Sequence, residues 1–215
     1  MKNILIIGMG EFGKHLADQL VKMQNQVCII DNDPHIINML SNSFDNAYVG
    51  DCMQKITLQE LGVQNFDICI VAIGQNFQAS LEITSNLKEL GAKRIIAKSA
   101  SDLQSKFLKM AGADETFYPE KDIAEKVAML CNANNLFDYI QVSENYSIFE
   151  IKVLKSWVGK NLRQLDIRNK YDVNIIAVRN AEKVKIPTAD YIFLDDDRIY
   201  LFGKDTTIKK LKNIL

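Results

Sequence analysis

The chain has 215 residues, of which 47% are hydrophobic and 25% are charged, and its formal net charge is -1. This is the composition of an ordinary globular protein with room for one or two domains. Lysine and arginine are spread through the sequence, which excludes a dedicated nucleic-acid or polybasic membrane surface. No apolar run approaches the roughly 18 residues that span a bilayer. We therefore expect a cytoplasmic protein without direct membrane insertion, for which any membrane role must come through a partner.

The first predicted element is an apolar strand that ends in a glycine-rich turn. The run Ile4–Ile7 is followed by Gly8, Gly10 and Gly13, and then by an amphipathic helical pattern as far as Met23. In this strand, turn and helix context, G-x-G-x-x-G is the dinucleotide-binding fingerprint, with phosphate bound by free N–H groups at the start of the helix. The pattern predicts an adenine-nucleotide site. The alternative is a unit whose glycines serve packing only.

The second predicted strand supplies a carboxylate at the expected distance from this turn. Gln26–Ile30 ends on Asp31, which lies eighteen residues after Gly13. The acidic residue that accepts hydrogen bonds from ribose hydroxyls usually follows the fingerprint by about 20 residues. We therefore predict that Asp31 binds ribose.

The following segments repeat the alternation of strand and helix. Further strands are predicted at Ala47–Val49, Asp67–Ile73, Arg94–Lys98 and Glu115–Tyr118, with helices beginning at Pro34, near Thr57, at Phe77 and after Ser101. Six strands separated by helices predict an α/β fold with a Rossmann-like, doubly wound parallel sheet. We assign this nucleotide-binding domain to residues 1–118.

A long helix follows the predicted sheet, in a segment that we assign to residues 119–138 as a crossover and linker. It opens at Pro119–Asp122 and continues from Ile123 to Asn132 with apolar positions on one face. A helix appended to a complete sheet often packs on a second copy, so we predict a dimer contact here. A helix that caps its own domain is an equally open alternative.

The remaining residues, 139–215, predict a small α+β domain without a glycine-rich loop. Its expected elements are strands at Tyr146–Val153, Val173–Val178 and Arg198–Gly203, a helix at Leu162–Tyr171 and a terminal helix at Thr206–Ile214. The four cysteines of the whole chain are far apart, and we interpret them as reduced core residues and not as a metal or disulfide framework.

The sequence offers little for catalysis. A hydride-transfer enzyme needs a proton donor or acceptor beside the nicotinamide, and the only histidines are His15 and His35, in early helices. Tyr200 and Lys204 have a dehydrogenase-like spacing, but Gly203 and the apolar alternation predict a strand end there. We predict a non-catalytic nucleotide sensor. The rival interpretations are a small NAD(P)-dependent oxidoreductase and a structural ring component with a degenerate nucleotide site.

Several longer strings resemble the KtrA/TrkA family, the cytosolic gating subunits of Ktr and Trk potassium transporters. The similar strings are Gly8-x-Gly10-x-Phe12-Gly13, Ile70-Val71-Ala72-Ile73-Gly74-x-Asn76-x-Gln78-Ala79-Ser80, Leu87–Leu90, Gly112–Asp114, Pro119–Asp122, Tyr146–Ile148 and Lys170-Tyr171. The resemblance covers nearly the whole chain. It implies a domain that regulates potassium conductance (RCK) and a C-terminal ligand-binding domain. It also implies homodimers that assemble into rings of eight beneath a Ktr/Trk-type potassium-transporting membrane protein.

The resemblance also implies a nucleotide site at which ATP and ADP have different effects on the shape of the ring. AMP and NAD(H) are further candidate ligands. In that family Asp51 would accept from the adenine amine, and Ala72 and Gly74 would line the crevice. The cofactor-binding residues expected in this sequence are Gly8, Gly10, Glu11, Phe12, Gly13, Asp31, Asn32, Asp51, Cys52, Ala72, Gly74 and Lys98.

One departure from the family concerns the position directly after the second glycine, where arginine is common and this chain has Glu11. Exchanging a bidentate cation for an anion beside a polyphosphate changes the local charge by two units. We therefore predict weakened discrimination of ATP over ADP, which Lys14 or Lys98 would offset only in part.

Two further sites follow from the resemblance alone. Glu120 corresponds to a carboxylate that binds an activating divalent cation, one from each protomer, and the alternative is a carboxylate favoured by the helix dipole. In the C-terminal domain, KtrA relatives bind cyclic di-AMP. The corresponding residues are Ile167, Arg168, Asn174, Ile175 and Pro187, with ordinary surface and core roles as the alternative.

Overall fold

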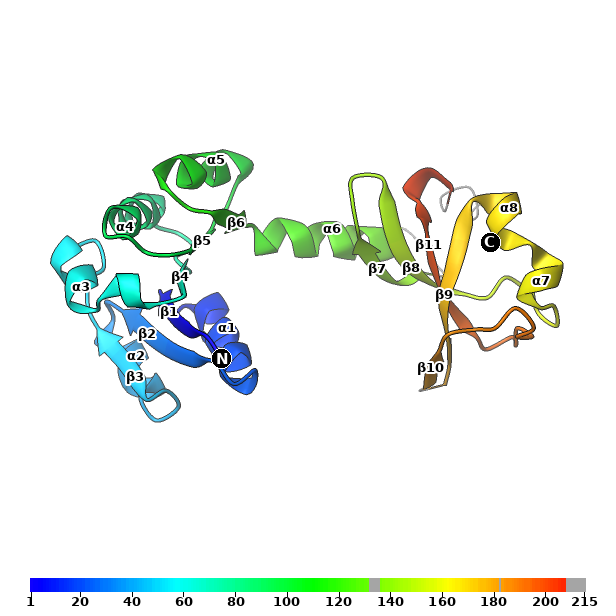
Figure 1. Ribbon diagram of the computed structural model, residues 1–215, viewed down its shortest axis with the longest axis horizontal. Coiled ribbons are helices and arrows are strands. Elements are labelled where there is room, and N and C mark those ends of the chain that lie inside the picture. The colour runs from blue at the N-terminus through cyan, green and yellow to red at the C-terminus, as the bar shows by residue number, and fades with distance from the viewer. Residues whose placement is uncertain (132–135, 182, 208–215) are drawn as a thin grey trace. The chain divides into compact units, whose positions relative to one another are not determined.

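The computed structural model describes residues 1–131, 136–181 and 183–207 (Figure 1). The chain divides into two compact units, residues 1–121 and 122–215, each with its own sheet and core. The terminal helix predicted at Thr206–Ile214 lies, from residue 208 onward, outside the described residues.

The first unit is built on a six-stranded parallel sheet with the strand order β3-β2-β1-β4-β5-β6. This is the doubly wound order of Rossmann-like folds, so the predicted fold class is confirmed. The strands of this sheet are β1 (Asn3–Ile7), β2 (Gln26–Asp31), β3 (Asn46–Val49), β4 (Ile68–Val71), β5 (Ile95–Lys98) and β6 (Glu115–Phe117). All four residues of β4 are buried, as expected for a parallel strand that is covered on both faces.

Helices cover both faces of this sheet. They are α1 (Glu11–Lys22), α2 (Pro34–Leu40), α3 (Lys55–Glu60), α4 (Phe77–Glu89) and α5 (Asp102–Ala111), with a short 3-10 helix η1 (Val63–Asn65). Ala17 of α1 and Ile37 of α2 belong to one hydrophobic cluster, on one face of the sheet. The other face carries a second cluster that contains Leu58 of α3, Leu87 of α4 and Leu108 of α5. The parallel sheet is therefore the middle layer of three.

The second unit contains a five-stranded antiparallel sheet with the order β10-β9-β11-β8-β7. Its elements are β7 (Leu136–Gln141), β8 (Tyr146–Lys152), α7 (Leu162–Leu165), α8 (Ile167–Tyr171), β9 (Val173–Asn180), β10 (Lys183–Lys185) and β11 (Arg198–Lys204). A buried cluster around Phe149, Trp157 and Phe193 forms its core. The predicted small α+β domain is confirmed. The helix α6 (Pro119–Cys131) comes between the two sheets in the chain, and the division of the units falls within it.

Two local features differ from the sequence expectations. The helix predicted at Leu162–Tyr171 is interrupted at Asp166, whose left-handed backbone (φ 47°) ends α7 and begins α8. The strand β7 was not expected, because its sequence Leu-Phe-Asp-Tyr-Ile-Gln does not alternate between apolar and polar residues. Its pairing with β8 also shifts register between Leu136 and Asp138.

Among the described residues, every helix is too short or too polar to cross a lipid bilayer.

Candidate functional site

A crevice of about 560 Å³ opens in the first unit beside the carboxyl ends of β1, β2 and β4. In this strand order, β1 and β4 are neighbours whose connections run to opposite sides, which is the position where doubly wound sheets bind ligands. Eight of the twelve predicted cofactor residues line it, namely Gly8, Gly10, Asp31, Asn32, Asp51, Cys52, Ala72 and Gly74.

The glycines of the first turn have the geometry that the fingerprint requires. Gly8 has φ +96°, a backbone conformation that side chains rarely adopt, and a Cβ there would lie 3.1 Å from Ile73. At Gly13 a Cβ would lie 2.1 Å from the carbonyl oxygen of Gly8, so any larger residue would separate α1 from β1. Around Gly10, by contrast, nothing lies within 4 Å of a Cβ position. The turn therefore leaves open space beside Gly10.

The start of α1 is suited to bind an anion in that space. Gly10 is the N-cap residue of α1, and no side chain caps the helix there. The first N–H groups of a helix have no partner within it and carry the positive end of its dipole. A phosphate at this point would accept hydrogen bonds from the backbone without displacing a protein group.

Asp31 connects the second strand to the glycine-rich turn. One oxygen of its carboxylate accepts a hydrogen bond from the N–H of Met9 at 2.6 Å, and the other accepts from the N–H of Asp33 at 2.9 Å. The carboxylate thus fixes the turn between Gly8 and Gly10 while it lines the crevice. Asp51, at the same edge of the sheet, accepts from the N–H of Met53 at 3.0 Å.

The other four predicted cofactor residues lie beside the crevice and not in its lining. The side chain of Glu11 is 86% exposed and pairs with Lys14 at 3.3 Å. Phe12 packs on Phe117, with 5.0 Å between ring centroids. Gly13 is buried against Gly8.

Lys98, the last of the four, joins the edge of the crevice to the start of α6. Its Nζ lies 5.5 Å from the centre of the Phe12 ring and 3.5 Å from the position of a Cβ at Gly74. The same Nζ donates a hydrogen bond to Oε1 of Glu120 at 2.6 Å. This hydrogen bond is the main reason why the pKa of Glu120 is lowered from its usual range.

The crevice lining contains no histidine, tyrosine, lysine or hydroxyl side chain. The thiol of Cys52 is its only sulfhydryl, and burial raises the pKa of that thiol to about 12. A thiol that stays protonated at neutral pH is a poor nucleophile and a poor base. The lining can hold a ligand, and its charged side chains are those of Asp31 and Asp51.

Some lining residues were not predicted from the sequence. Gln75 and Asn76 come from the loop after β4, and Met53 follows Asp51. Asn76 also caps α4, where its side-chain oxygen accepts from the N–H of Ala79 at 3.0 Å. The signal that could have identified this loop is its place at the carboxyl end of a fully buried strand.

The structure places the residues predicted for the divalent cation and for cyclic di-AMP in different surroundings. Among the described residues there is no group of three or more His, Cys, Asp or Glu side chains that could hold a metal ion, and Glu120 pairs with Lys98. Ile167 is buried in the core of the second unit, whereas Arg168 and Asn174 are exposed and Ile175 and Pro187 are half-buried. Pro187 follows β10 in the chain. Because β10 runs antiparallel to β9, the chain after β10 continues toward the half of β9 that contains Asn174 and Ile175.

These features define a class of two-domain protein, in which a Rossmann-like domain is followed by a small domain with an antiparallel sheet. Comparison with known sequences agrees, since residues 4–119 match the TrkA-N domain and residues 147–215 match the TrkA-C domain. The chain belongs to the KtrA/TrkA family of potassium uptake proteins, as its sequence strings indicated.

Two relatives from Bacillus subtilis (strain 168) match along almost their whole length. Ktr system potassium uptake protein C is 35% identical over 212 residues, which cover 98% of this chain and 96% of the relative. Ktr system potassium uptake protein A is 31% identical over 213 residues, which cover 99% of this chain and 96% of the relative. Among solved structures, the GsuK RCK domain shares the fold, with a TM-score of 0.70 and 19% identity. That match covers 99% of this chain but only 47% of the GsuK chain.

Proposed function

We propose that this protein is a non-catalytic regulatory subunit of a Ktr/Trk-type potassium transport system. It would bind an adenine nucleotide in its first domain and thereby gate the membrane partner. The observation that carries the proposal is the convergence of eight predicted residues on one crevice at the topological switch point. Membership of the family supports the transport role, because its relatives are named potassium uptake proteins. The protein would act in the cytoplasm, at the inner face of the membrane, through its membrane partner.

The nucleotide would lie across the carboxyl ends of β1, β2 and β4. Its phosphates would accept from the N–H groups at the start of α1, beside the open space at Gly10. Asp31 would accept from ribose hydroxyls, and Asp51 from the adenine amine. ADP, ATP, AMP and NAD(H) share the adenosine part that these contacts would recognise.

The relatives support a role without chemistry, because they are named potassium uptake proteins. His15 and His35 are exposed on α1 and α2 and do not line the crevice. Occupancy of the crevice would instead favour one of two conformations of the assembly, by differential affinity for them. An oxidoreductase would need a proton donor near Gly74, and the ammonium group that lies 3.5 Å from the Cβ position there, that of Lys98, is paired with Glu120.

Lys98 would couple the bound phosphates to α6. Its ammonium group lies between the edge of the crevice at Gly74 and the first turn of α6 at Glu120. An anionic phosphate would compete with Glu120 for this cation. Glu120 would then be free to share a divalent cation with the same residue of a second protomer, because a cation between them cancels the repulsion of the two carboxylates.

The helix α6 would carry the dimer contact, and residues 119–138 would act as the crossover between domains 1–118 and 139–215. No residue of α6 is buried within the chain. Ile123 and Val127 are 60% and 50% exposed and lie four residues apart, on one face of the helix. Homodimers formed in this way would assemble into a ring of eight.

The second domain would bind cyclic di-AMP through Arg168, whose exposed guanidinium suits a phosphate. Asn174 would contact the base or the backbone of the ligand, and Ile175 and Pro187 would form the apolar surface. Ile167 would support this site from the core.

Native mass spectrometry of the intact protein, with and without ADP, tests the assembly and the ligand together. We expect an even number of subunits, up to eight, with one nucleotide retained for each chain. A monomer that retains no nucleotide at any concentration of ADP would contradict the proposal.

A further inference from the structure

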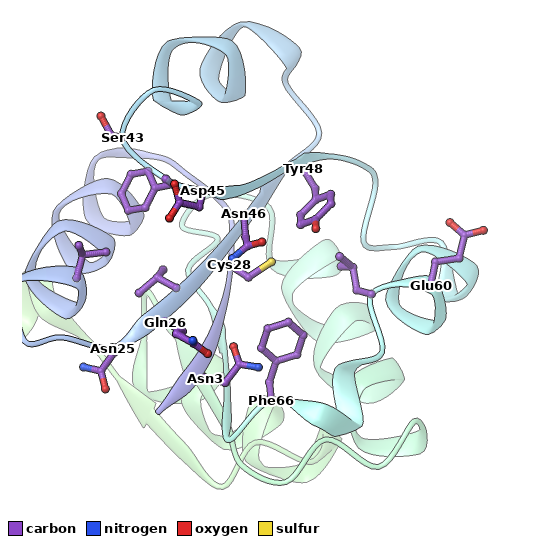
Figure 2. A pocket seen from close by; sticks show the side chains of 14 residues that line it. Asn3, Asn25, Gln26, Cys28, Ser43, Asp45, Asn46, Tyr48, Glu60 and Phe66 are labelled. Carbon is purple, nitrogen blue, oxygen red and sulfur yellow. The ribbon is translucent and has the colours of Figure 1, made fainter. Parts of the chain in front are cut away.

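A second cavity, of about 500 Å³, lies at the amino ends of the strands of the six-stranded sheet, opposite the crevice (Figure 2). Its walls include Asn3, Gln26 and Asn46, which begin β1, β2 and β3. The nucleotide crevice lies at the carboxyl ends of the strands, and the two cavities share no lining residue. The volume falls within the range of about 300 to 1,000 Å³ that is typical of small-molecule sites. The proposed function makes no use of this amino-edge cavity.

Polar groups that line the amino-edge cavity are free to bind a ligand. Within the described part of the chain, the side chains of Asn3, Gln26, Asn46 and Tyr48 make no hydrogen bond. Three amides and a phenol provide both donors and acceptors. The Asn25 amide, also in the lining, already donates to the carbonyl of Leu20 at 3.1 Å.

The inner wall of the cavity is apolar and aromatic. Figure 2 shows the Tyr48 ring on one side of the Cys28 thiol and the Phe66 ring on the other. Phe66 is 8% and Cys28 is 5% exposed, whereas Tyr48 is 46% exposed. Burial raises the pKa of Cys28 to about 11, so this thiol stays uncharged and adds no anion to the wall. Aromatic faces attract cations as well as apolar groups.

The charge of the lining is entirely negative. Asp45 and Glu60 are its only charged side chains, because the lining contains no lysine, arginine or histidine. Neither carboxylate forms an ion pair with any residue that the structure describes. In Figure 2, Asp45 and Glu60 lie on opposite sides of Tyr48. A phosphate would meet two carboxylates and no cationic side chain in this lining, which sets the cavity apart from the crevice with its helix N-terminus.

We propose that the amino-edge cavity binds a small organic cation, a protonated amine or guanidinium compound with an apolar body. The apolar body would lie against the exposed ring of Tyr48, and the amide oxygens of Asn3 and Asn46 would accept from the cationic groups. Asp45 and Glu60 would attract the cation to the opening of the cavity. The potassium regulator would then carry a second input, chemically distinct from the adenine nucleotide.

Calorimetric titration of the intact protein with agmatine, which has a guanidinium and an ammonium group, tests this inference. We expect saturable binding of one agmatine for each chain, and no binding of the uncharged 1,4-butanediol. The double variant D45N/E60Q should weaken binding by roughly tenfold, and Tyr48→Leu by roughly threefold, from loss of carboxylate and cation–π contacts. The substituted side chains are exposed, so the variants should fold as the unmodified protein does.

The matched control is the double variant D18N/E144Q, because Asp18 and Glu144 are exposed carboxylates outside the cavity lining. It changes the net charge by two units, as D45N/E60Q does, and should leave the affinity for agmatine unchanged. Saturating ADP should also leave it unchanged, which separates this cavity from the nucleotide crevice. Absence of saturable binding, equal affinity in D45N/E60Q, or displacement of agmatine by ADP would overturn the inference.

Discussion

The Nζ of Lys98 lies 2.6 Å from Oε1 of Glu120 and thereby connects the end of β5 to the first turn of α6. The Lys98 side chain is only 11% exposed, whereas that of Glu120 is 59% exposed. The lysine is therefore held at the edge of the crevice, and the glutamate is the partner with freedom to move. In our account this ion pair is the point at which a bound phosphate would act on α6.

Replacing Lys98 with methionine should raise the pKa of Glu120 toward its ordinary value of 4.5. The hydrogen bond from Lys98 lowers this pKa, so Glu120 stays ionised and the pair persists at neutral pH. The pair is lost when the pH falls below 4.5 and passes the lowered pKa, at which Glu120 is protonated. Titration of the Glu120 carboxyl carbon by NMR measures the change. A pKa that is identical in the unmodified protein and the variant would show that the pair does not form in solution.

Replacing Gly13 with alanine should destabilise the first domain by at least about 2 kcal/mol, since forced overpacking costs about 1 to 3 kcal/mol. The new Cβ would lie 2.1 Å from the carbonyl oxygen of Gly8. Gly10→Ala is the control, because nothing lies within 4 Å of its Cβ, and its stability should stay within about 1 kcal/mol of the unmodified protein. Urea unfolding followed by circular dichroism compares the two. Equal stability of both variants would contradict the tight turn described here.

Replacing Glu11 with arginine should increase the preference for ATP over ADP by roughly three- to tenfold. The position is exposed, so solvent screening reduces the effect of the two-unit change in charge. Glu11→Gln, which removes only the negative charge, should give an intermediate preference. Calorimetry with both nucleotides measures these ratios. A strong ATP preference in the unmodified protein would refute our interpretation of Glu11.

Replacing Asp197 with alanine should destabilise the second domain by about 3 kcal/mol or more, because each unsatisfied buried donor costs about 1 to 3 kcal/mol. Its buried carboxylate accepts from Asn180 Nδ2 at 2.7 Å, from the Tyr191 hydroxyl at 2.7 Å and from the N–H of Leu194 at 2.8 Å. Fluorescence of Trp157, the single tryptophan, reports unfolding of this domain.

The control for that measurement is Asp195→Ala. The Asp195 side chain is 66% exposed and, among the residues that the structure describes, forms an ion pair only with Lys152 at 3.8 Å, so its loss should change the free energy of unfolding by less than about 1 kcal/mol. If the two variants unfold at the same urea concentration, the buried hydrogen bonds of Asp197 do not stabilise the domain as described.

The parallel sheet and its crevice could be predicted because their signals are local. Apolar runs such as Ile4–Ile7 identify buried strands, and the glycine-rich turn follows directly in the sequence. The carboxyl ends of parallel strands meet at one edge, so Asp31 and Gly74 could be assigned to one site before any geometry was known.

The features that were not predicted depend on contacts or on single backbone angles. Lys98 and Glu120 are 22 residues apart, and only the fold brings them together. The break at Asp166 requires a left-handed residue that the helical pattern conceals. Ile167 was predicted to contact a ligand, but its side chain lies in the core, since the apolar pattern does not distinguish a ligand surface from a core surface. The amino-edge cavity was missed because amides at strand starts resemble ordinary surface residues.

The central claim, that the crevice at the carboxyl ends of β1, β2 and β4 binds an adenine nucleotide, is tested most directly by titrating ADP into the intact protein and into Gly10→Ala. We expect saturable binding of one ADP for each chain in the unmodified protein, and an affinity at least roughly tenfold lower in the variant, whose methyl group occupies the space beside the start of α1. No binding in the unmodified protein, or undiminished affinity in a folded Gly10→Ala, would contradict the account.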